Sequence, residues 1–232
     1  MKILGIDTSS KRCSVCILED TNKIIELHSD DERTHSQKLM PLINDLFQKS
    51  NMTLKDIDII ACSIGPGSFT GVRIGISTAK AFSDALNKQA IGISSLESLA
   101  YNAKDNITNN DIVCSVIDAK NDNVYFGIFD NNFNKLEDLS TCSIDELVSK
   151  LHNYDSNILF IGDGGITYKE IFKNNFNERA KFAEEEKNLA SSISIAELAY
   201  NKYVNSTFNS SLSPLYLRKS QAERSLEERK DC

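Results

Sequence analysis

The sequence predicts an α/β protein with two similar lobes, each a mixed sheet flanked by helices. Short apolar runs of strand length alternate with longer segments whose apolar residues recur at helical spacing. A strand, a polar turn and a second strand open the chain, with Asp7 at the end of the first strand, and the same pattern returns around Asp118. This repeat indicates an internal duplication, which would give two similar lobes. A length of 232 residues is enough for two small lobes.

The first lobe is expected to span residues 1–106. Its helices carry apolar residues three and four positions apart, as Leu39, Ile43 and Leu46 do in the first helix. Pro41 either starts or kinks the regular part of that helix. In order, the expected elements are the strands Lys2–Ile6, Cys13–Glu19 and Ile24–Ser29, the helix His35–Lys49, the strand Ile57–Ile64, the helix Val72–Leu86, the strand Ala90–Ile93 and a helix that begins at Ser94 or Ser95.

The second lobe is expected to span residues 107–218, after a polar, turn-rich segment that marks the boundary. Its late helix is amphipathic, with Leu198, Ala199 and Tyr203 expected to face inward. In order, the expected elements are the strands Val113–Ile117 and Val124–Phe129, the helix Ile144–Leu151, the strand Ile158–Ile161, the segment Tyr168–Phe172 after a glycine turn, the helix Ile195–Val204 and the extended segment Ser213–Arg218. Residues 219–232 form a tail of mixed charge, which is typical of a solvated end.

Composition excludes some classes of function. The net charge of −7 argues against a protein that holds tRNA by itself, because phosphate neutralisation needs a basic face, so contact with tRNA is expected only indirectly. No apolar run approaches membrane-span length. The start of the chain is too short and too soon charged for a signal peptide, so we expect a cytoplasmic protein.

Cys13 and Cys16 form a C-x-x-C pair, which can indicate zinc or redox chemistry. No second cysteine pair at suitable spacing exists, and the three histidines are scattered. Residues three apart in a strand point to opposite faces. Two buried thiols on opposite faces of a strand are therefore favoured over a metal site.

Four of the ten glycines lie between Gly65 and Gly75, in the segment GPGSFTGVRIG. The segment joins an apolar strand to a helix, and Thr70 is the predicted N-cap. Glycines here allow backbone N–H groups to cradle an anion, or they let the chain turn tightly and seat the helix on the sheet. The segment has neither the ending of a Walker loop nor dinucleotide spacing. The structural role is favoured, because tight glycine turns outnumber anion sites.

The helix Val72–Leu86 carries apolar or small residues on more than one side. Val72, Ile76, Ala79 and Phe82 share one face, and glycine, alanine and serine cover much of the rest. A helix that is apolar on two sides has two neighbours. One side is expected to meet the sheet and the other a second chain; burial wholly within its own fold is the alternative.

Two lobes that each open with a strand, a turn and a strand carrying an aspartate have the layout of the actin/hexokinase/Hsp70-like ATPase fold, whose lobes are ribonuclease-H-like. In this layout Asp7 and Asp118 face the cleft between lobes, where carboxylates hold a metal ion or a metal-bound water. They equally suit hydrogen bonds that cap turns. Asp7, Thr8, Ser9 and Asp118 are the candidate nucleotide-binding residues, although the second turn lacks glycine.

The glycine segment resembles the signature of the bacterial TsaB family, also called YeaZ. The resemblance covers nearly the whole chain, with further matches at IDTS from Ile6, HSQ from His35, GISSLE from Gly92, IDA from Ile117 and YLR from Tyr216. Asp122 departs from the pattern, since the family usually has a glycine there. The resemblance implies the same ATPase fold and a part in making N6-threonylcarbamoyladenosine in tRNA.

The resemblance also implies partners, namely a TsaD-like catalytic paralogue, a TsaE-like ATPase and a second copy of the chain. The two helices of the first lobe are the expected partner surface. The chain is expected to hold no cofactor alone, and a nucleotide at a shared interface in the complex is left open. The expected interface residues are His35, Leu39, Ile43, Arg73, Ile76, Ala79, Lys80 and Ser83.

TsaD carries a metal-binding His-x-x-x-His at the start of the helix that follows Gly-Val-Asn. When that Gly-Val-Asn is aligned with Gly92-Ile93-Ser94, the two histidine positions fall on Ser95 and Leu99, and leucine binds no metal. The resemblance thus implies no metal, no catalytic residue and no threonylcarbamoyl transfer by this chain alone. The leading hypothesis is a non-catalytic partner of the TsaD-like enzyme. The alternatives are an ATP-binding phosphotransferase or ATPase that uses Asp7 and Asp118, and a metallopeptidase-like protein.

Overall fold

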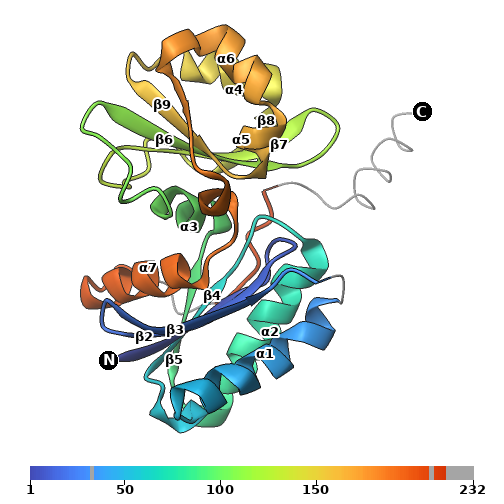
Figure 1. Cartoon of the computed structure of the whole chain (residues 1–232), viewed down its shortest axis with the longest axis vertical. Helices are drawn as coiled ribbons and strands as arrows, with labels where there is room; N and C mark the ends of the chain where they lie inside the picture. Colours follow the sequence, from blue (N-terminus) through green and yellow to red (C-terminus); the bar gives the residue numbers. More distant parts are fainter. Residues whose placement is uncertain (32–33, 209–211, 218–232) are drawn as a thin grey trace.

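The computed structural model describes residues 1–31, 34–208 and 212–217. The chain forms two lobes, each built on a five-stranded mixed sheet (Figure 1). The first sheet has the order β3 (Asn22–Ser29), β2 (Cys13–Glu19), β1 (Lys2–Asp7), β4 (Ile59–Ser63) and β5 (Gln89–Ile93). The second has the order β10 (Ala180–Phe182), β9 (Asn157–Ile161), β6 (Asp111–Asp118), β7 (Asn123–Phe129) and β8 (Ser140–Ser143).

The two sheets have the same topology. In each, the first three strands along the chain pair antiparallel, and the next two add parallel to the first strand. Equal topology in two successive halves is the result expected of an internal duplication. The predicted α/β fold of two ribonuclease-H-like lobes is confirmed.

Helices cover both faces of the first sheet. One face packs against α1 (His35–Ser50) and α2 (Phe69–Leu86), and the other packs against α7 (Ser192–Val204). Side chains alternate between these two cores along each strand, as the period of two requires. Cys13 lies in the core under α1 and α2, and Cys16 lies in the core under α7. Both thiols are buried and unpaired, which confirms the packing interpretation of the C-x-x-C pair.

The second sheet is covered in the same way. Its outer face packs against α4 (Ile144–Leu151) and α6 (Lys169–Phe176), with Phe160 stacked on Phe172 at 3.9 Å between ring centres. Its inner face packs against α3 (Ser95–Tyr101). The short helix α5 (Asp163–Thr167) follows β9, and the described residues also form three 3₁₀ turns: η1 (Leu54–Asp56), η2 (Asn177–Arg179) and η3 (Glu185–Asn188).

Two helices cross between the lobes, so the lobes are not the contiguous segments 1–106 and 107–218. Helix α3 comes from the first half of the chain but covers the second sheet, whereas α7 comes from the second half and covers the first sheet (Figure 1). The side chain of Asn102 fixes this crossing. Its amide donates to the carbonyl oxygens of Lys187 and Leu189, both at 2.9 Å, and its oxygen accepts from Ser194 at 2.6 Å.

Two local predictions are wrong. Helix α2 begins at Phe69, and its N-cap is Ser68, whose hydroxyl accepts the N–H of Gly71; Thr70 lies one step inside the first turn. In α7 the buried residues are Ile195, Ala196 and Ala199, whereas Tyr203 is 40% exposed near the end of the helix, beyond the edge of the sheet core. The predicted tail 219–232 and Arg218 lie outside the described residues.

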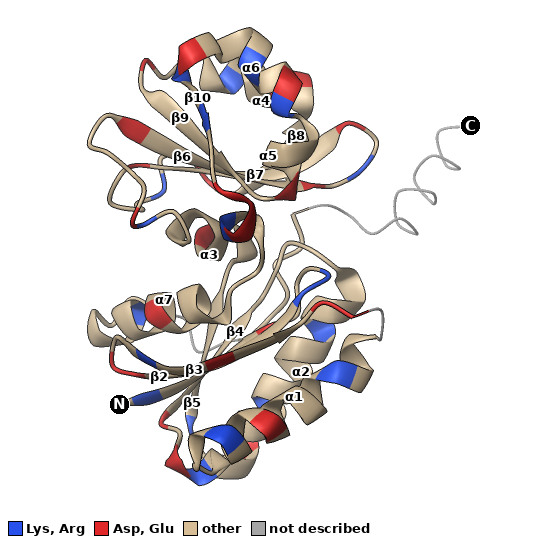
Figure 2. Cartoon of the chain, in the orientation of Figure 1, with Lys and Arg blue, Asp and Glu red and all other residues tan. Residues whose placement is uncertain are grey.

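Charged residues of both signs are interspersed over the helices of both lobes in the view of Figure 2. No helix within the described part of the chain is long and apolar enough to cross a membrane. The interspersed charge agrees with the acidic net balance, which disfavours a continuous phosphate-binding face.

Asp111 at the start of β6 gives a pH-dependent prediction. Its buried carboxylate accepts hydrogen bonds from Lys181 at 2.7 Å, from the hydroxyl and N–H of Thr108, and from Asn157 at 3.1 Å. Burial by itself raises the pKa of Asp111, but these hydrogen bonds outweigh it and lower the pKa to about 2. The carboxylate therefore stabilises the fold fully above its ordinary pKa, and this contribution is lost as pH falls toward 2.

We expect Asp111→Asn to lower the free energy of unfolding at pH 7 by about 1.5 kcal/mol, the usual contribution of charged hydrogen bonds. The difference between wild type and variant should shrink between pH 4 and pH 2, because the wild-type carboxylate becomes protonated there. Urea unfolding at several pH values measures this difference in stability, and Asp155→Asn at an exposed position is the control. A difference that stays constant over this range would contradict the assignment.

Candidate functional site

The turn between β1 and β2 is packed tightly under the glycine segment. Asp7 accepts hydrogen bonds from the N–H of Ser9 at 2.9 Å and from its hydroxyl at 2.7 Å. The hydroxyl of Thr8 donates to the carbonyl oxygen of Gly71 at 2.7 Å, and the N–H of Ser68 donates to the carbonyl oxygen of Ser9 at 2.7 Å. Asp7, Thr8 and Ser9 are all buried. Their polar groups are therefore directed into the protein's own loop.

Glycine is required here because the backbones approach closely. A Cβ atom on Gly71 would lie closer than 3.0 Å to the carbonyl oxygen of Thr8, and one on Gly67 would lie equally close to that of Ser9. Gly67 also has φ of +155°, which L side chains rarely adopt. The structural interpretation of the glycine segment accounts for these contacts.

The side chains of the predicted nucleotide site on the β1–β2 turn have hydrogen-bond partners within the fold. Thr8 and Ser9 already use their hydroxyls within the fold, and burial raises the pKa of Asp7 although the hydrogen bonds from Ser9 oppose this. That Asp7, Thr8 and Ser9 bind a nucleotide stays a prediction, and these contacts give it no support. The Thr8 hydroxyl is directed at Gly71 in α2, and the Ser9 hydroxyl is directed at Asp7.

Asp118, the fourth candidate, is also satisfied within its own lobe. Its carboxylate accepts the N–H of Lys120 at 2.8 Å and pairs with the Lys120 ammonium at 2.6 Å. Burial raises the pKa of Asp118, but the hydrogen bonds from Lys120 outweigh it and lower the pKa. Lys120, Asn121 and Asp122 all have positive φ, so the turn closes without glycine. Asp7 and Asp118 thus each cap their own turn, as the Asx alternative expected.

The two positions aligned with the metal ligands of TsaD are buried in the fold. The hydroxyl of Ser95 is 2.7 Å from that of Ser63, and Leu99 packs close to Gly162. In the described residues, no three His, Cys, Asp or Glu side chains are placed to hold a metal ion. That the chain holds no metal stays a prediction.

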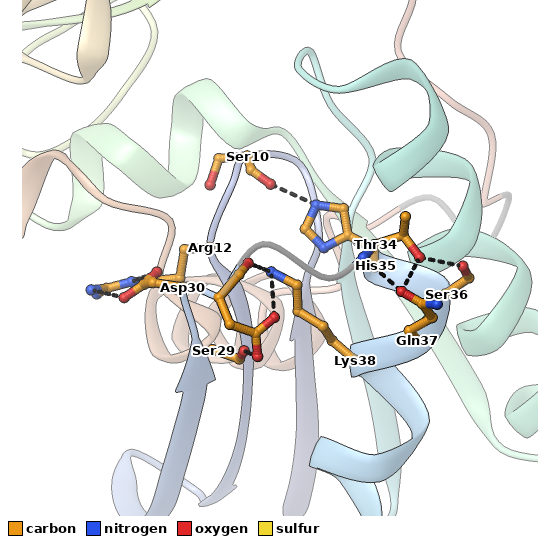
Figure 3. Close-up of polar contacts among 10 residues, drawn as sticks. Ser10, Arg12, Ser29, Asp30, Thr34, His35, Ser36, Gln37 and Lys38 are labelled. Carbon is orange, nitrogen blue, oxygen red and sulfur yellow. Dashed lines mark hydrogen bonds and ion pairs between the residues drawn. The ribbon is translucent and has the colours of Figure 1, made fainter.

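His35 joins the start of α1 to the β1–β2 turn (Figure 3). Its Nε2–H donates to the carbonyl oxygen of Ser10 at 2.7 Å, and Thr34 and Gln37 form a capping box at the helix start. Nδ1 of His35 is buried, with no hydrogen-bond partner in the structure, and burial lowers the pKa of the ring. Lys38, one turn on, is buried and pairs with Asp31. His35 therefore holds the helix in place, and is only partly available to a partner.

Four of the predicted interface residues are wrong. Leu39, Ile43, Ile76 and Ala79 are at most 4% exposed and belong to the core between the sheet and the two helices. The apolar stripe of each helix packs against its own sheet, which is the ordinary consequence of amphipathic spacing. The prediction assigned that stripe to a partner.

The outer face of α1 and α2 is exposed and consists largely of small or uncharged side chains. Arg73 and Lys80, both predicted, are exposed on α2, while Ser83 is half-buried and donates to the carbonyl oxygen of Lys88. The small residues of α2 were expected to meet a second chain, but the predicted interface list omitted several exposed members of this helix face, among them Met40, Pro41, Asn44, Thr70, Ser77, Ala81 and Ala85. Residues 77, 81 and 85 recur every four positions opposite the core stripe, and that spacing was the available signal.

A shallow apolar groove of about 510 Å³ runs beside this helix face, near the end of α1. It is lined by Met40, Phe47, Met52, Leu54 and Phe82, among others. An exposed apolar groove next to a helix face of small residues is a feature of association surfaces. The face and groove together are the surface of this chain best suited to bind another protein.

Comparisons with known proteins identify relatives of the whole chain. The family described as TsaD, tRNA N6-adenosine threonylcarbamoyltransferase, matches residues 25–226. The tRNA threonylcarbamoyladenosine biosynthesis protein TsaB of Buchnera aphidicola subsp. Schizaphis graminum is 33% identical, over 75% of this chain and 82% of that protein. The TsaB protein of Haemophilus influenzae is 29% identical over 94% of both chains.

Solved structures agree with these sequence matches. YeaZ from Pseudomonas aeruginosa is 25% identical, with a TM-score of 0.78 over 93% of this chain and 99% of that chain. The ROK hexokinase from Thermus thermophilus has a TM-score of 0.55 at 10% identity, over 88% of this chain and all of that chain, and shares the fold alone.

Proposed function

Because the chain belongs to the TsaB family of tRNA threonylcarbamoyladenosine biosynthesis proteins, we propose that it is the non-catalytic partner of a TsaD-like enzyme. Its role in the biosynthesis of this tRNA modification follows from the family. The finer role is an activating one. The TsaD-like enzyme transfers the threonylcarbamoyl group from threonylcarbamoyl adenylate to the exocyclic amine of adenosine 37. This chain supports that enzyme by binding it.

One observation carries the proposal. The turn that could hold a nucleotide in an ATPase of this fold is filled by the chain's own glycine segment, while the outer face of α1 and α2 stays open. A chain whose glycine segment fills this turn, but whose outer helix face of small residues is exposed, is suited to binding rather than to catalysis. Ala81 and Ser77 let a partner helix approach closely.

The other expected partners remain part of the proposal. A TsaE-like ATPase joins the complex, a second copy of this chain competes for the same helix face, and tRNA is contacted indirectly. A nucleotide, where one binds, sits at the interface between chains. The phosphotransferase alternative loses its support, because Asp7 and Asp118 are each occupied within their own turn. The metallopeptidase alternative has no ligand set in the part of the chain that the structure describes.

A tRNA modification assay tests this function. Threonine, bicarbonate, ATP and unmodified tRNA are combined with the enzyme that makes the adenylate, the TsaE-like ATPase, and either this chain, the TsaD-like paralogue, or both. We expect modified adenosine only when both are present. The control replaces this chain with its Ala81→Glu variant, which should reduce the product to the level seen without this chain. Modification by this chain without the paralogue would contradict the proposal.

A further inference from the structure

Two exposed aromatic rings and an arginine meet at the start of α2. Phe69 is 49% exposed and Tyr216 is 52% exposed, and their rings stack with centres 5.7 Å apart. The two residues come from distant parts of the chain. Residues 212–217 return along the glycine segment, where Leu212 is buried in the core and the N–H of Leu215 donates to the carbonyl oxygen of Ile64 at 2.8 Å. Tyr216 is therefore positioned by an anchored segment.

Arg73 is held in one orientation by these two rings. Its guanidinium carbon lies 3.8 Å from the centre of the Phe69 ring, and its Nε–H donates to the Tyr216 hydroxyl at 2.8 Å. No carboxylate among the described residues forms an ion pair with it. Among the described residues, none accepts a hydrogen bond from the two terminal NH₂ groups of Arg73, which face an outside acceptor in this proposal. A guanidinium held this way loses little conformational freedom on binding.

The surroundings select the acceptor. Arg73 borders a shallow groove of about 410 Å³ along α2, lined by Phe69, Thr70, Ile74, Ser77 and Thr78, and it is the single charged residue of that lining. Binding along a phosphate backbone uses several cations, and the chain carries a net charge of −7. One arginine flanked by aromatic and apolar surface instead matches a hot spot for a single acidic side chain on a protein.

We infer that Phe69, Arg73 and Tyr216 form a clamp for one carboxylate, flanked by apolar side chains, on the partner protein. The carboxylate accepts two hydrogen bonds from the terminal NH₂ groups, and its apolar neighbours cover the exposed ring edges and the groove. This inference rests on the proposed function, since the partner is taken to be the TsaD-like enzyme. It deepens that function by stating which chemical group the partner presents at the start of α2.

Titration calorimetry of the full chain with the TsaD-like protein tests the clamp. Arg73→Ala should raise the dissociation constant on the order of 30-fold, the effect of removing one side of a desolvated charge pair. Arg73→Lys should recover only part of this, because it keeps the charge but not the fork or the stacking. Tyr216→Phe should weaken binding by about fivefold through the lost hydrogen bond that orients Arg73. Lys173→Glu on α6 is the matched charge control for Arg73→Glu and should leave affinity unchanged.

Charge reversal identifies the carboxylate. Arg73→Glu is titrated against partner variants in which surface acids are changed one at a time to arginine. One of these partner variants should recover at least a tenth of the affinity that Arg73→Glu loses. If Ala81→Glu abolishes binding while Arg73→Ala does not change it, the clamp is refuted and the proposed function stands. If the wild-type proteins do not bind, both fail. If Arg73→Ala weakens tRNA binding by the complex but not the affinity between the proteins, the acceptor is a phosphate and the inference is overturned.

Discussion

Replacing Gly71 with alanine is expected to lower the free energy of unfolding by about 3 kcal/mol, the upper range for overpacking a filled core. Gly71 lies in the first turn of α2 with ordinary helical geometry, where alanine by intrinsic propensity would stabilise a helix by about 1 kcal/mol. The sign reverses because the new methyl group would lie closer than 3.0 Å to the carbonyl oxygen of Thr8 and against the ring of His35. A carbonyl oxygen that belongs to a buried turn cannot move without breaking that turn.

Gly165 supplies the matched control. It also lies in a helix, α5, and a Cβ atom there would meet its nearest neighbour, Phe160, at the ordinary contact distance of 3.5 Å. Gly165→Ala should therefore leave stability unchanged or raise it slightly. Thermal and urea unfolding of the two variants gives the comparison directly. Equal stabilities for the two variants would show that the β1–β2 turn yields to the added methyl, and that the glycine segment is not needed to hold it.

The fold could be predicted from sequence because its signals are local. Apolar runs set the strands, helical spacing set the helices, and the repeated strand–turn–strand around Asp7 and Asp118 indicated the duplication. The crossing of α3 and α7 could not be predicted this way. It depends on which helix covers each inner sheet face, and amphipathic spacing says that a face is buried without saying against which sheet.

The residues predicted for the partner surface differ from those that the structure leaves exposed. The glycine segment and the two helices stay the proposed partner region, yet several residues assigned to a partner were those with the strongest apolar periodicity, such as Ile76, and these belong to the core. Partner surfaces are set by what is left exposed, which a single sequence does not display. The clamp is a further example, because Tyr216 reaches Arg73 across 143 positions of the chain.

Glutamate substitutions two residues apart on α2 should have opposite consequences. Ala79 is fully buried in the core, so Ala79→Glu places a carboxylate among apolar side chains and should lower the free energy of unfolding by about 4 kcal/mol or more. Ala81 is exposed on the outer face, so Ala81→Glu should change stability by no more than about 0.5 kcal/mol. Ala81→Glu should instead weaken association with the TsaD-like partner at least about tenfold, because a charged side chain stands between two closely packed helices.

The comparison separates a folding defect from a binding defect. Urea unfolding gives the stability of each variant, and calorimetric titration with the TsaD-like protein gives the affinity. Asn174→Glu adds the same charge to an exposed position of α6, in the other lobe, and should alter neither quantity. A folded Ala81→Glu chain that binds with wild-type affinity would exclude this helix face as the partner surface. A stable Ala79→Glu chain would mean that the core between α2 and the first sheet can open, and the assignment of its inner and outer faces would then be reversed.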